Sequence, residues 1–387
     1  MTHNPVGQPP DEPQHDDRTR PDAFPGMPRR RAVAAGLVSV VALGIAGCDE
    51  GSRRSAPVDR GYQVPDGDAA TGSGPSASAS APRWPLTGAL IDGRPTPRPA
   101  LSVKIENSDD ARPQSGLEDA DLVFEQMVEG GTTRFNAVFH SVMPGTMGPI
   151  RSIRPMDAAI SGQFGGLLAF SGGQGAYVRR AIQAGLQVMS LDAGSPGFYR
   201  AGHRYAPHNV YGRPRAFLRA ANGSPESPSN DILEFAREAD GATAADHGER
   251  AGTVRVSFPS ANPGWRWTPD ARTGRGVGAG AWRRTEDGAA QSSEDGKAVL
   301  ASNVVVLRVQ VEMTGARDAA GAQVPETILQ GEGDAVVFSR GRAVEAAWSK
   351  GGPTRPMQLT RGGEPVLLAP GPTWIELLPV SGGSLSF

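Results

Sequence analysis

The sequence predicts an α+β protein, in which a mixed α/β N-terminal domain is followed by a mostly β C-terminal domain. Between residues 83 and 250, apolar runs alternate with segments of helical spacing, and the order strand, glycine-rich turn, helix, strand is typical of a βαβ unit. From residue 251 to 387, apolar runs are separated by Gly, Pro and Asp turns, with no convincing helix between them. The predicted domains are therefore 83–250 and 251–387.

The composition excludes several classes of function. The chain has 387 residues, a net charge of −2 and a pI near 6.3, whereas nucleic-acid binding usually requires a basic face. A single cysteine excludes an internal disulfide and any cysteine-rich metal site. The glycine-rich stretch 274–280 has no βαβ unit around it, and the chain contains no Walker loop. We therefore expect no nucleic-acid partner, no metal and no cofactor.

The N-terminus has the organisation of a lipoprotein precursor. Residues 1–26 are polar and proline-rich, and we interpret them as disordered or as a non-translated extension before Met27. Residues 27–47 form a signal peptide with three arginines, an apolar run too short to span a bilayer comfortably, and small residues at the end. Ile45-Ala46-Gly47-Cys48 looks like a bacterial lipobox, which predicts lipidation of Cys48. The paired arginines leave both Sec and twin-arginine export open.

Residues 48–82 separate the predicted anchor from the folded part of the chain. They are rich in Ser, Ala, Gly and Pro, a composition that cannot bury a core, and we interpret them as a flexible tether. A random coil of this length holds the folded part roughly 30 Å from the lipid. We expect the protein at the extracytoplasmic face of a bacterial cell membrane, with that membrane as a partner.

Apolar periodicity and turn residues predict the elements of the first domain. Gly130-Gly131 indicates a two-residue hairpin, and in its second strand Phe135, Ala137 and Phe139 alternate with polar residues. Pro214 suits the first turn of a helix. The predicted strands are Leu101–Ile105, Asp121–Val128, Thr132–Phe139, Leu167–Phe170 and Leu186–Leu191. The predicted helices are Met156–Phe164, Ala176–Ala184, Pro214–Ala221 and Asp231–Asp240.

The second domain is predicted to consist of strands and turns. Its strand-like runs are Val254–Phe258, Asn303–Val311, Ala335–Phe338 and Trp374–Leu378. Residues 268–298 are rich in glycine and charge and are expected to include a long loop. We assign the tryptophans to core and turn packing. An exposed Trp265/Trp267 pair would be the exception, because it could stack on a glycan.

Several blocks of the chain resemble one family. They are Val103–Asn107, Arg112–Leu117, Ala120–Glu125, Val128–Phe135, Gly148–Pro155 and Ala206–Tyr211 in the first domain, and 303–307, 331–333, 348–350 and 371–376 in the second. These blocks are similar to the signatures of the YerB-like lipoproteins, bacterial envelope lipoproteins built from two domains of unknown function. The resemblance covers most of 95–380 and implies no established substrate or reaction. The chain departs from the family at Phe170-Ser171-Gly172-Gly173, where we expect a His before the turn, so no catalytic His is carried over there.

A polar site is predicted around the hairpin and the turn that follows it. Pro149 and Pro155 constrain this turn, which preorganises its arginines for binding. Four arginines exceed what the two nearby glutamates neutralise, which leaves positive charge for an anionic envelope ligand or a protein partner. The alternative is a structural ion-pair network. The candidate ligand-binding residues are Asn107, Arg112, Glu129, Arg134, Arg151, Ser152, Arg154, His208 and Asn209.

Catalysis is a second hypothesis, and Glu125, Glu129 and His208 are its candidate residues. They would serve a hydrolase or transferase that acts on a cell-wall glycan or a phosphodiester. On one strand the two glutamates would lie roughly 13 Å apart, at about 3.3 Å per residue. Catalytic carboxylates of glycosidases lie roughly 5–9.5 Å apart, so ion pairs with arginines are the better interpretation. A third hypothesis is a structural adaptor in an envelope complex.

Overall fold

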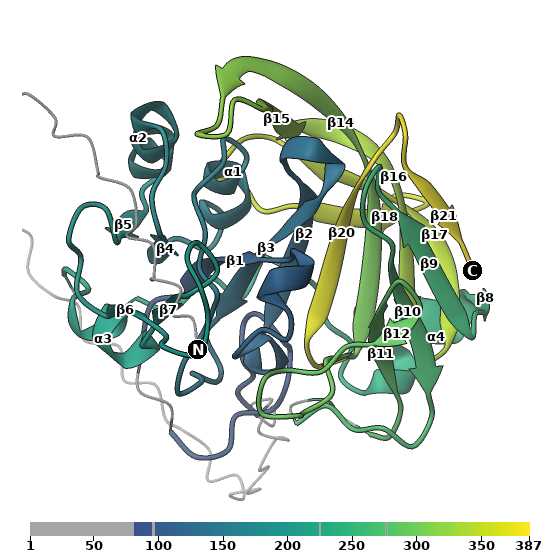
Figure 1. Cartoon of the computed structure of the whole chain (residues 1–387). Helices are drawn as coiled ribbons and strands as arrows, with labels where there is room; N and C mark the ends of the chain where they lie inside the picture. The colour runs from purple at the N-terminus through teal and green to yellow at the C-terminus, as the bar shows by residue number, and fades with distance from the viewer. Residues whose placement is uncertain (1–80, 95–96, 224–225, 275, 277) are drawn as a thin grey trace, which may run out of the picture. The chain divides into compact units, whose positions relative to one another are not determined.

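A sheet of thirteen strands runs through the part of the chain that the computed structural model describes, which is residues 81–387 apart from 95–96, 224–225, 275 and 277 (Figure 1). The predicted extension, the signal peptide, Cys48 and nearly all of the tether lie outside these residues. None of the described helices has the length and apolar character needed to cross a membrane.

The thirteen strands come from both predicted domains. Eleven of them follow one another across the sheet as β19 (Glu364–Pro365), β18 (Gln358–Arg361), β17 (Arg342–Lys350), β16 (Gly331–Ser339), β14 (Asn303–Arg317), β20 (Thr373–Pro379), β2 (Leu122–Met127), β3 (Thr133–Phe139), β1 (Leu101–Glu106), β4 (Leu167–Phe170) and β5 (Gln187–Ser190). In addition, β15 (Gln323–Ile328) pairs with β14, and β8 (Glu249–Arg250) pairs with β17.

Strand β20 joins the two halves of this sheet. It runs parallel to β14 on one side and parallel to β2 on the other, as Figure 1 shows. Strand β2 then forms the predicted antiparallel hairpin with β3, although a 3₁₀ turn over Glu129–Gly131 connects them instead of a two-residue loop. The N-terminal and C-terminal segments therefore share one hydrogen-bonded sheet. The domain boundary near residue 250 stays a prediction.

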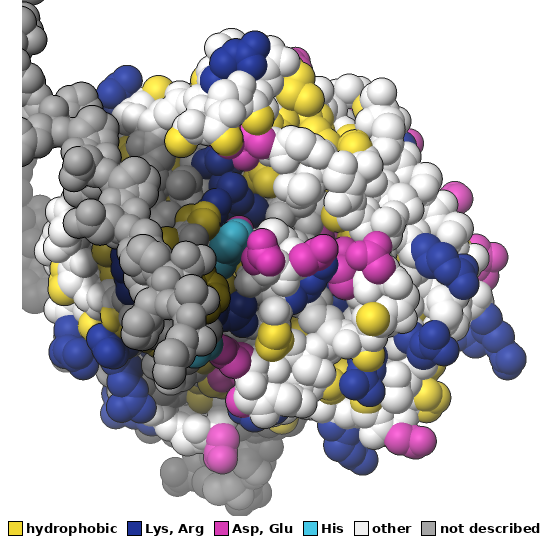
Figure 2. All heavy atoms as spheres, in the orientation of Figure 1, with side chains coloured by type: hydrophobic (Ala, Val, Ile, Leu, Met, Phe, Trp, Pro, Cys, Tyr) yellow, Lys and Arg dark blue, Asp and Glu magenta, His cyan; other side chains and the backbone are white. Residues whose placement is uncertain are grey.

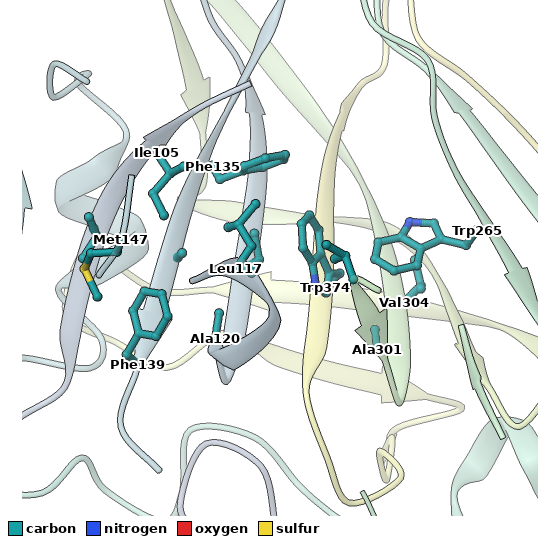
Figure 3. Packing of buried hydrophobic residues seen from close by; sticks show 14 of the residues in the cluster. Ile105, Leu117, Ala120, Phe135, Phe139, Met147, Trp265, Ala301, Val304 and Trp374 are labelled. Carbon is teal, nitrogen blue, oxygen red and sulfur yellow. The ribbon is translucent and has the colours of Figure 1, made fainter. Parts of the chain in front are cut away.

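A second sheet of six strands packs on one face of the large sheet. Its strands are β12 (Ala289–Ala290), β11 (Ala281–Glu286), β10 (Pro263–Thr268), β9 (Thr253–Ser257) and β21 (Ser384–Ser386) in that order, with β13 (Leu300–Ala301) paired to β11. Trp265 of β10 meets Trp374 of β20 edge-on at 5.1 Å between ring centroids, and Phe135 of β3 meets the same ring at 5.2 Å (Figure 3). This contact between the sheets buries large aromatic area, which is the main favourable term in such packing.

Both faces of the central strands are buried. Phe135, Ala137 and Phe139 belong to the core that faces the second sheet, as their alternation predicts. On the opposite face, Asn136 and Val138 are also fully buried. Helix α1 (Asp157–Ser161) lies over that opposite face, and the short hairpin of β6 (Phe198–Arg200) and β7 (Val210–Gly212) forms a separate two-stranded sheet. Polar side chains on these strands therefore need partners inside the protein.

The structure is mostly β with few helices, which confirms the coarser part of the predicted class. The order β4, α2 (Gly175–Gln183), β5 is a βαβ unit with parallel strands, as the sequence predicts. Helix α3 (Pro214–Arg219) also lies where it is predicted. The N-terminal segment is less helical than expected, and α4 (Thr243–His247) was not foreseen.

The predicted helix over Asp231–Asp240 is wrong. The N–H of Ala236 donates to the carbonyl of Leu368, and the N–H of Leu368 donates to the carbonyl of Glu234, both at 2.9 Å. This extended pairing buries Ile232 and Leu233 against the large sheet. Apolar burial along an extended segment therefore outweighs the helical spacing of this stretch.

The structure also bears on two expectations for the second domain. The described residues between Thr268 and Ala281 form no strand or helix, as expected for a long loop within 268–298, and β11 and β12 follow them. Trp265 is only 1% exposed, so Trp265 and Trp267 form no exposed pair for a glycan. Trp267 instead packs edge-on against Trp282 of β11, at 5.4 Å between ring centroids. The tryptophans serve packing, which is the role that we assign to them from the sequence.

Candidate functional site

The arginine turn, residues 151–154, is held by backbone hydrogen bonds on both sides. The N–H of Arg151 donates to the carbonyl of Lys104 in β1 at 2.9 Å, and the N–H of Ile153 donates to the carbonyl of Gly172 at 2.9 Å. Gly173 has a φ of +152°, and a Cβ atom there would lie 2.4 Å from Cγ2 of Ile153. The glycine pair therefore allows the loop after β4 to approach the turn and fix its arginines.

The turn opens onto a cavity of about 330 Å³, which we call the arginine pocket. Arg134, Arg151, Ser152 and Arg154 line it, so the structure brings four of the predicted residues together. The start of α2 contributes Tyr177, and the hairpin between β14 and β15 contributes Arg317. Figure 2 shows basic side chains gathered in a hollow below α2, beside a histidine and several acidic side chains.

Glutamates balance part of this charge. Glu129 binds Arg154 through both carboxylate oxygens, and the Nη2–Oε2 distance is 2.8 Å. Nη2 of Arg134 lies 3.9 Å from Oε2 of Glu129. Nε of Arg151 lies 3.5 Å from Oε1 of Glu106. Arg154 therefore belongs to a structural ion pair, which was the alternative to ligand binding considered from the sequence. Arg134 is less tightly paired.

The pKa of Arg134 reflects burial first and the neighbouring positive charges second. Burial lowers it to about 10, and the charges of Arg154 and Arg151 add to this lowering. The guanidinium is still charged at neutral pH. A buried cation beside two others is unfavourable, and an anion would relieve this repulsion.

Asp157 of α1 supports the arginine turn through its side chain. It was not among the residues predicted from the sequence. Its carboxylate accepts hydrogen bonds from the backbone N–H of Arg154 at 2.6 Å and from Nδ2 of Asn136 at 3.0 Å. It also pairs with the fully buried Lys104 at 3.0 Å. Burial lowers the pKa of Lys104 to about 8, against the raising effect of Asp157. An acidic residue in the first helical turn after Pro155 was the available signal.

His208 and Asn209 lie beside the arginine pocket rather than in its lining. Nδ1 of His208 is 3.0 Å from Oε1 of Glu106, the carboxylate that also faces Arg151. Oδ1 of Asn209 accepts a hydrogen bond from Nη1 of Arg200 at 2.8 Å. These contacts fix the loop before β7, so both residues have structural partners in this structure.

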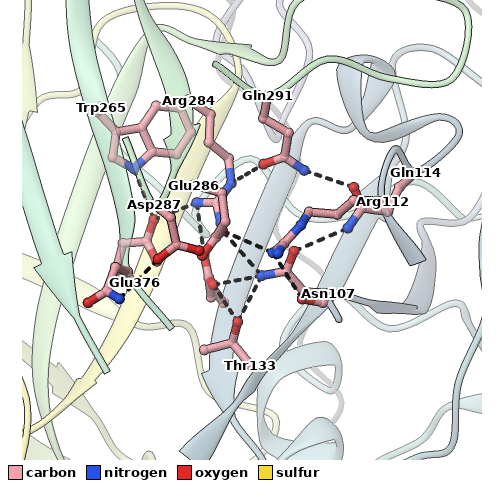
Figure 4. Close-up of polar contacts among 12 residues, drawn as sticks. Asn107, Arg112, Gln114, Thr133, Trp265, Arg284, Glu286, Asp287, Gln291 and Glu376 are labelled. Carbon is pink, nitrogen blue, oxygen red and sulfur yellow. Dashed lines mark hydrogen bonds and ion pairs between the residues drawn. The ribbon is translucent and has the colours of Figure 1, made fainter. Parts of the chain in front are cut away.

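Asn107, Arg112 and Glu125 belong to a second cluster, which lies between the two sheets (Figure 4). Nδ2 of Asn107 donates to Thr133 at 2.9 Å and to Glu125 at 3.2 Å. Nη1 of Arg112 is 3.8 Å from Oε2 of Glu286. The structure therefore separates these three predicted residues from the arginine pocket.

Arg284 of β11 is the centre of this second cluster, and it was not among the residues predicted from the sequence. Its guanidinium contacts Glu125 at 2.9 Å, Glu286 at 2.7 Å and Glu376 at 3.5 Å. The ring centroids of Phe135, Trp265 and Trp374 lie 5.2, 5.6 and 4.8 Å from its Cζ atom. The alternation of Trp282, Arg284 and Glu286 along β11 was the missed signal of a buried strand face.

The geometry of Glu125 argues against a catalytic role. Its side chain is 0% exposed, and burial raises its pKa to about 8. Glu129 does not lie on the same strand, since it belongs to the turn after β2 and is bound to Arg154. The two glutamates therefore have different partners in different clusters. Among the described residues, no three His, Cys, Asp or Glu side chains converge as metal ligands.

These features define a class of protein: a mostly β fold of two packed sheets, with a buried ion cluster between them and a basic pocket at one side. Residues 86–227 match the family described as "Protein of unknown function (DUF3048) N-terminal domain". Residues 254–375 match its C-terminal domain. The two matches together cover more than half of the chain, and the protein belongs to this family.

A relative and a solved structure agree with this assignment. The chain is 29% identical over 301 residues to the "Putative lipoprotein YerB" of Bacillus subtilis (strain 168), which covers 76% of this chain and 86% of that protein. The crystal structure of the YerB protein from Bacillus subtilis matches with a TM-score of 0.64 and 25% identity, over 79% of this chain and 99% of that chain. The resemblance to the YerB-like lipoproteins is thereby confirmed.

Proposed function

We propose that the protein is a lipid-anchored envelope protein that binds a small oxyanion in the arginine pocket. One observation carries this proposal: four arginines from three separate parts of the chain line one cavity of about 330 Å³. They are Arg134 from β3, Arg151 and Arg154 from the arginine turn, and Arg317 from the end of β14. The volume is at the lower end of the range for small-molecule sites.

Two of these arginines are available to a ligand. Arg154 is bound to Glu129, and Arg151 faces Glu106. Arg317 donates to the carbonyl of Gly321 and, among the described residues, forms no ion pair. The nearest carboxylate oxygen to Arg134 is 3.9 Å away. Guanidinium groups bind phosphate and carboxylate oxygens with paired N–H donors, so both side chains can serve an anion.

The arrangement of donors favours a tetrahedral oxyanion. A carboxylate is planar and is satisfied by one or two arginines in its plane, whereas the oxygens of a phosphate point in several directions. The arginines approach the cavity from β3, the turn and the β14–β15 hairpin, and α2 presents its N-terminal end there through Gln174 and Tyr177. The first turn of α2 carries no acidic residue. The positive end of the helix dipole adds positive potential there.

The predicted lipid anchor at the N-terminus indicates on which side of the membrane the arginine pocket lies. The lipobox ending in Cys48, the tether 48–82 and the lipoprotein description of the relative all support an anchor in the envelope. We infer that the arginine pocket is presented at the extracytoplasmic face of the membrane, roughly 30 Å from the lipid at the reach of the tether. A hydrolase or transferase using Glu125 is disfavoured, because that carboxyl group is enclosed between the sheets.

Calorimetric titration of the purified full-length protein tests the proposal. Ethyl phosphate is the probe, and ethanol is the matched compound without the oxyanion. We expect ethyl phosphate to bind at low ionic strength and ethanol not to bind. Arg134→Gln should weaken ethyl phosphate by about one to two decades, because a hydrogen bond to a charged group contributes about 1.5–3 kcal/mol.

Arg317→Ala should weaken ethyl phosphate by a smaller factor, because Arg317 is exposed and its charge is screened. Arg361→Ala removes an exposed arginine on β18 and is the charge-matched control. It should leave the affinity unchanged. If ethyl phosphate and ethanol behave alike at low salt, or if the control weakens binding as much as Arg134→Gln, the arginine pocket is not the site.

A further inference from the structure

An acidic side chain at the edge of the arginine pocket has no evident structural role. Asp192 lies two residues after the end of β5 and is exposed. Within the described part of the chain, no hydrogen bond or ion pair reaches its carboxylate. Its backbone N–H donates to the carbonyl of Ser171 at 3.0 Å, so the residue itself is firmly placed.

The loop after β4 makes room for this carboxylate. A Cβ atom on Gly172 would lie 1.8 Å from Oδ2 of Asp192, so no other residue fits there without displacing the aspartate. The same loop fixes the arginine turn, through the hydrogen bond from Ile153 to Gly172 and the close approach of Gly173 to Ile153. The backbone of Asp192 and the arginine turn are therefore both anchored to one short segment, which places the aspartate beside the arginines.

Asp318, the other aspartate of the pocket, differs from Asp192. Its Oδ1 accepts hydrogen bonds from the backbone N–H groups of Ala320 and Ala322, at 3.0 and 2.9 Å. Asp318 thus shapes the β14–β15 hairpin, while Asp192 has no such function. A free carboxylate beside an oxyanion site weakens binding of a simple anion by like-charge repulsion. It favours a ligand that carries a positive group next to the anionic one.

We propose, on the basis of the proposed function, that the ligand is a small zwitterion with a phosphate group and an ammonium group, of the phosphoethanolamine type. The arginines bind the phosphate, and Asp192 accepts hydrogen bonds from the ammonium group. Ammonium offers three donors without an acceptor, which suits a carboxylate that has no other partner. The positive and negative side chains of the pocket then each face a group of opposite charge on the ligand.

The test is a titration of the full-length protein with phosphoethanolamine and with ethyl phosphate, which differ only in the ammonium group. At low ionic strength we expect phosphoethanolamine to bind about three-fold more tightly, the size that partly exposed ion pairs support. Asp192→Asn should weaken phosphoethanolamine and strengthen ethyl phosphate, so that the order of the two affinities is lost or reversed. Asp334→Asn, which changes an exposed acid on β16 outside the pocket, is the matched control and should keep the wild-type order.

The outcomes separate this inference from the function on which it rests. If ethyl phosphate binds as tightly as phosphoethanolamine in the wild type, or if Asp192→Asn changes both affinities in the same direction, the zwitterion is excluded while oxyanion binding stands. If neither compound binds, the arginine pocket is not an oxyanion site and both proposals fall. Glycerophosphoethanolamine distinguishes the source: tight binding of this diester supports a lipid headgroup, and selectivity for phosphoethanolamine supports a soluble metabolite.

Discussion

Glu125 of β2 and Glu376 of β20 are paired residues on neighbouring parallel strands, and the guanidinium of Arg284 contacts both carboxyl groups. Both side chains are fully buried, and Nη1 of Arg284 lies 2.9 Å from the first and 3.5 Å from the second. Burial raises the pKa of Glu125 to about 8 and also raises the pKa of Glu376. The proton that the raised pKa keeps on Glu125 at neutral pH thus lies in the strand pair that joins the N-terminal and C-terminal segments.

The raised pKa of Glu125 makes the stability of the protein depend on pH. The carboxyl of Glu125 has a pKa of 4.5 without its native surroundings and of about 8 in the folded protein. Between these values the folded protein keeps a proton that the unfolded chain has released, so the free energy of unfolding falls as pH rises. One group contributes a slope of at most about 1.4 kcal/mol per pH unit. Glu125→Gln should therefore give a shallower decline in denaturant unfolding measured from pH 5 to 8.

The difference between variant and wild type is the quantity to compare. His140 acts in the opposite direction, because burial lowers its pKa and its stability contribution rises with pH. This contribution is common to both proteins and cancels. Glu332→Gln, an exposed change on β16, should keep the wild-type slope. Equal slopes for Glu125→Gln and wild type would show that Glu125 is ionised in the folded protein throughout this range.

Arg284→Met should destabilise the protein strongly. The variant leaves Glu125, Glu286 and Glu376 without their common cation, and removing one partner of a buried ion pair costs about 3–5 kcal/mol. Chemical unfolding at pH 7 measures this loss. Arg266→Met replaces an exposed arginine on the neighbouring strand β10 and should cost far less. A similar cost for the two variants would contradict the role given to the cluster.

Cys48→Ala tests the predicted anchor, which lies outside the described residues. We expect the wild-type protein in the membrane fraction of the producing cells and the variant in the soluble extracytoplasmic fraction. The reason is that none of the described helices can cross a bilayer, so the variant lacks the lipid that anchors the wild type once the signal peptide is removed. Metabolic labelling with a palmitate analogue adds a direct readout of Cys48. A labelled, membrane-bound Cys48→Ala protein would refute the assignment.

Local patterns predicted much of the fold. The βαβ order identified β4, α2 and β5, and the alternation of Phe135, Ala137 and Phe139 identified the buried face of β3. The arginine turn was predicted because its two arginines, Arg151 and Arg154, lie close together in the sequence. These features depend on neighbours along the chain, which a single sequence displays directly.

The missed features depend on contacts between distant segments. Arg284 lies more than 150 residues after Glu125 in the sequence, and its strand resembled a charged loop because three of its six side chains are charged. Arg317 enters the arginine pocket only because the long strand β14 extends beyond the sheet to form a hairpin with β15. A single sequence gives the periodicity of a strand but not the strand that faces it. For the same reason the sequence grouped Asn107 and Arg112 with the wrong cluster.

Arg154→Ala separates the structural part of the arginine pocket from its binding part. Arg154 binds both oxygens of Glu129, and each side chain is only 7% exposed. The variant therefore strands a carboxylate in a nearly buried place, and we expect a lower melting temperature together with weaker binding of ethyl phosphate. Adding Glu129→Gln removes the stranded charge, so the double variant should regain much of the melting temperature but not the affinity. Arg317→Ala is the contrasting variant, because it should weaken binding while the melting temperature stays at the wild-type value. If the double variant recovered the affinity as well, Arg154 would act only by holding Glu129 in place.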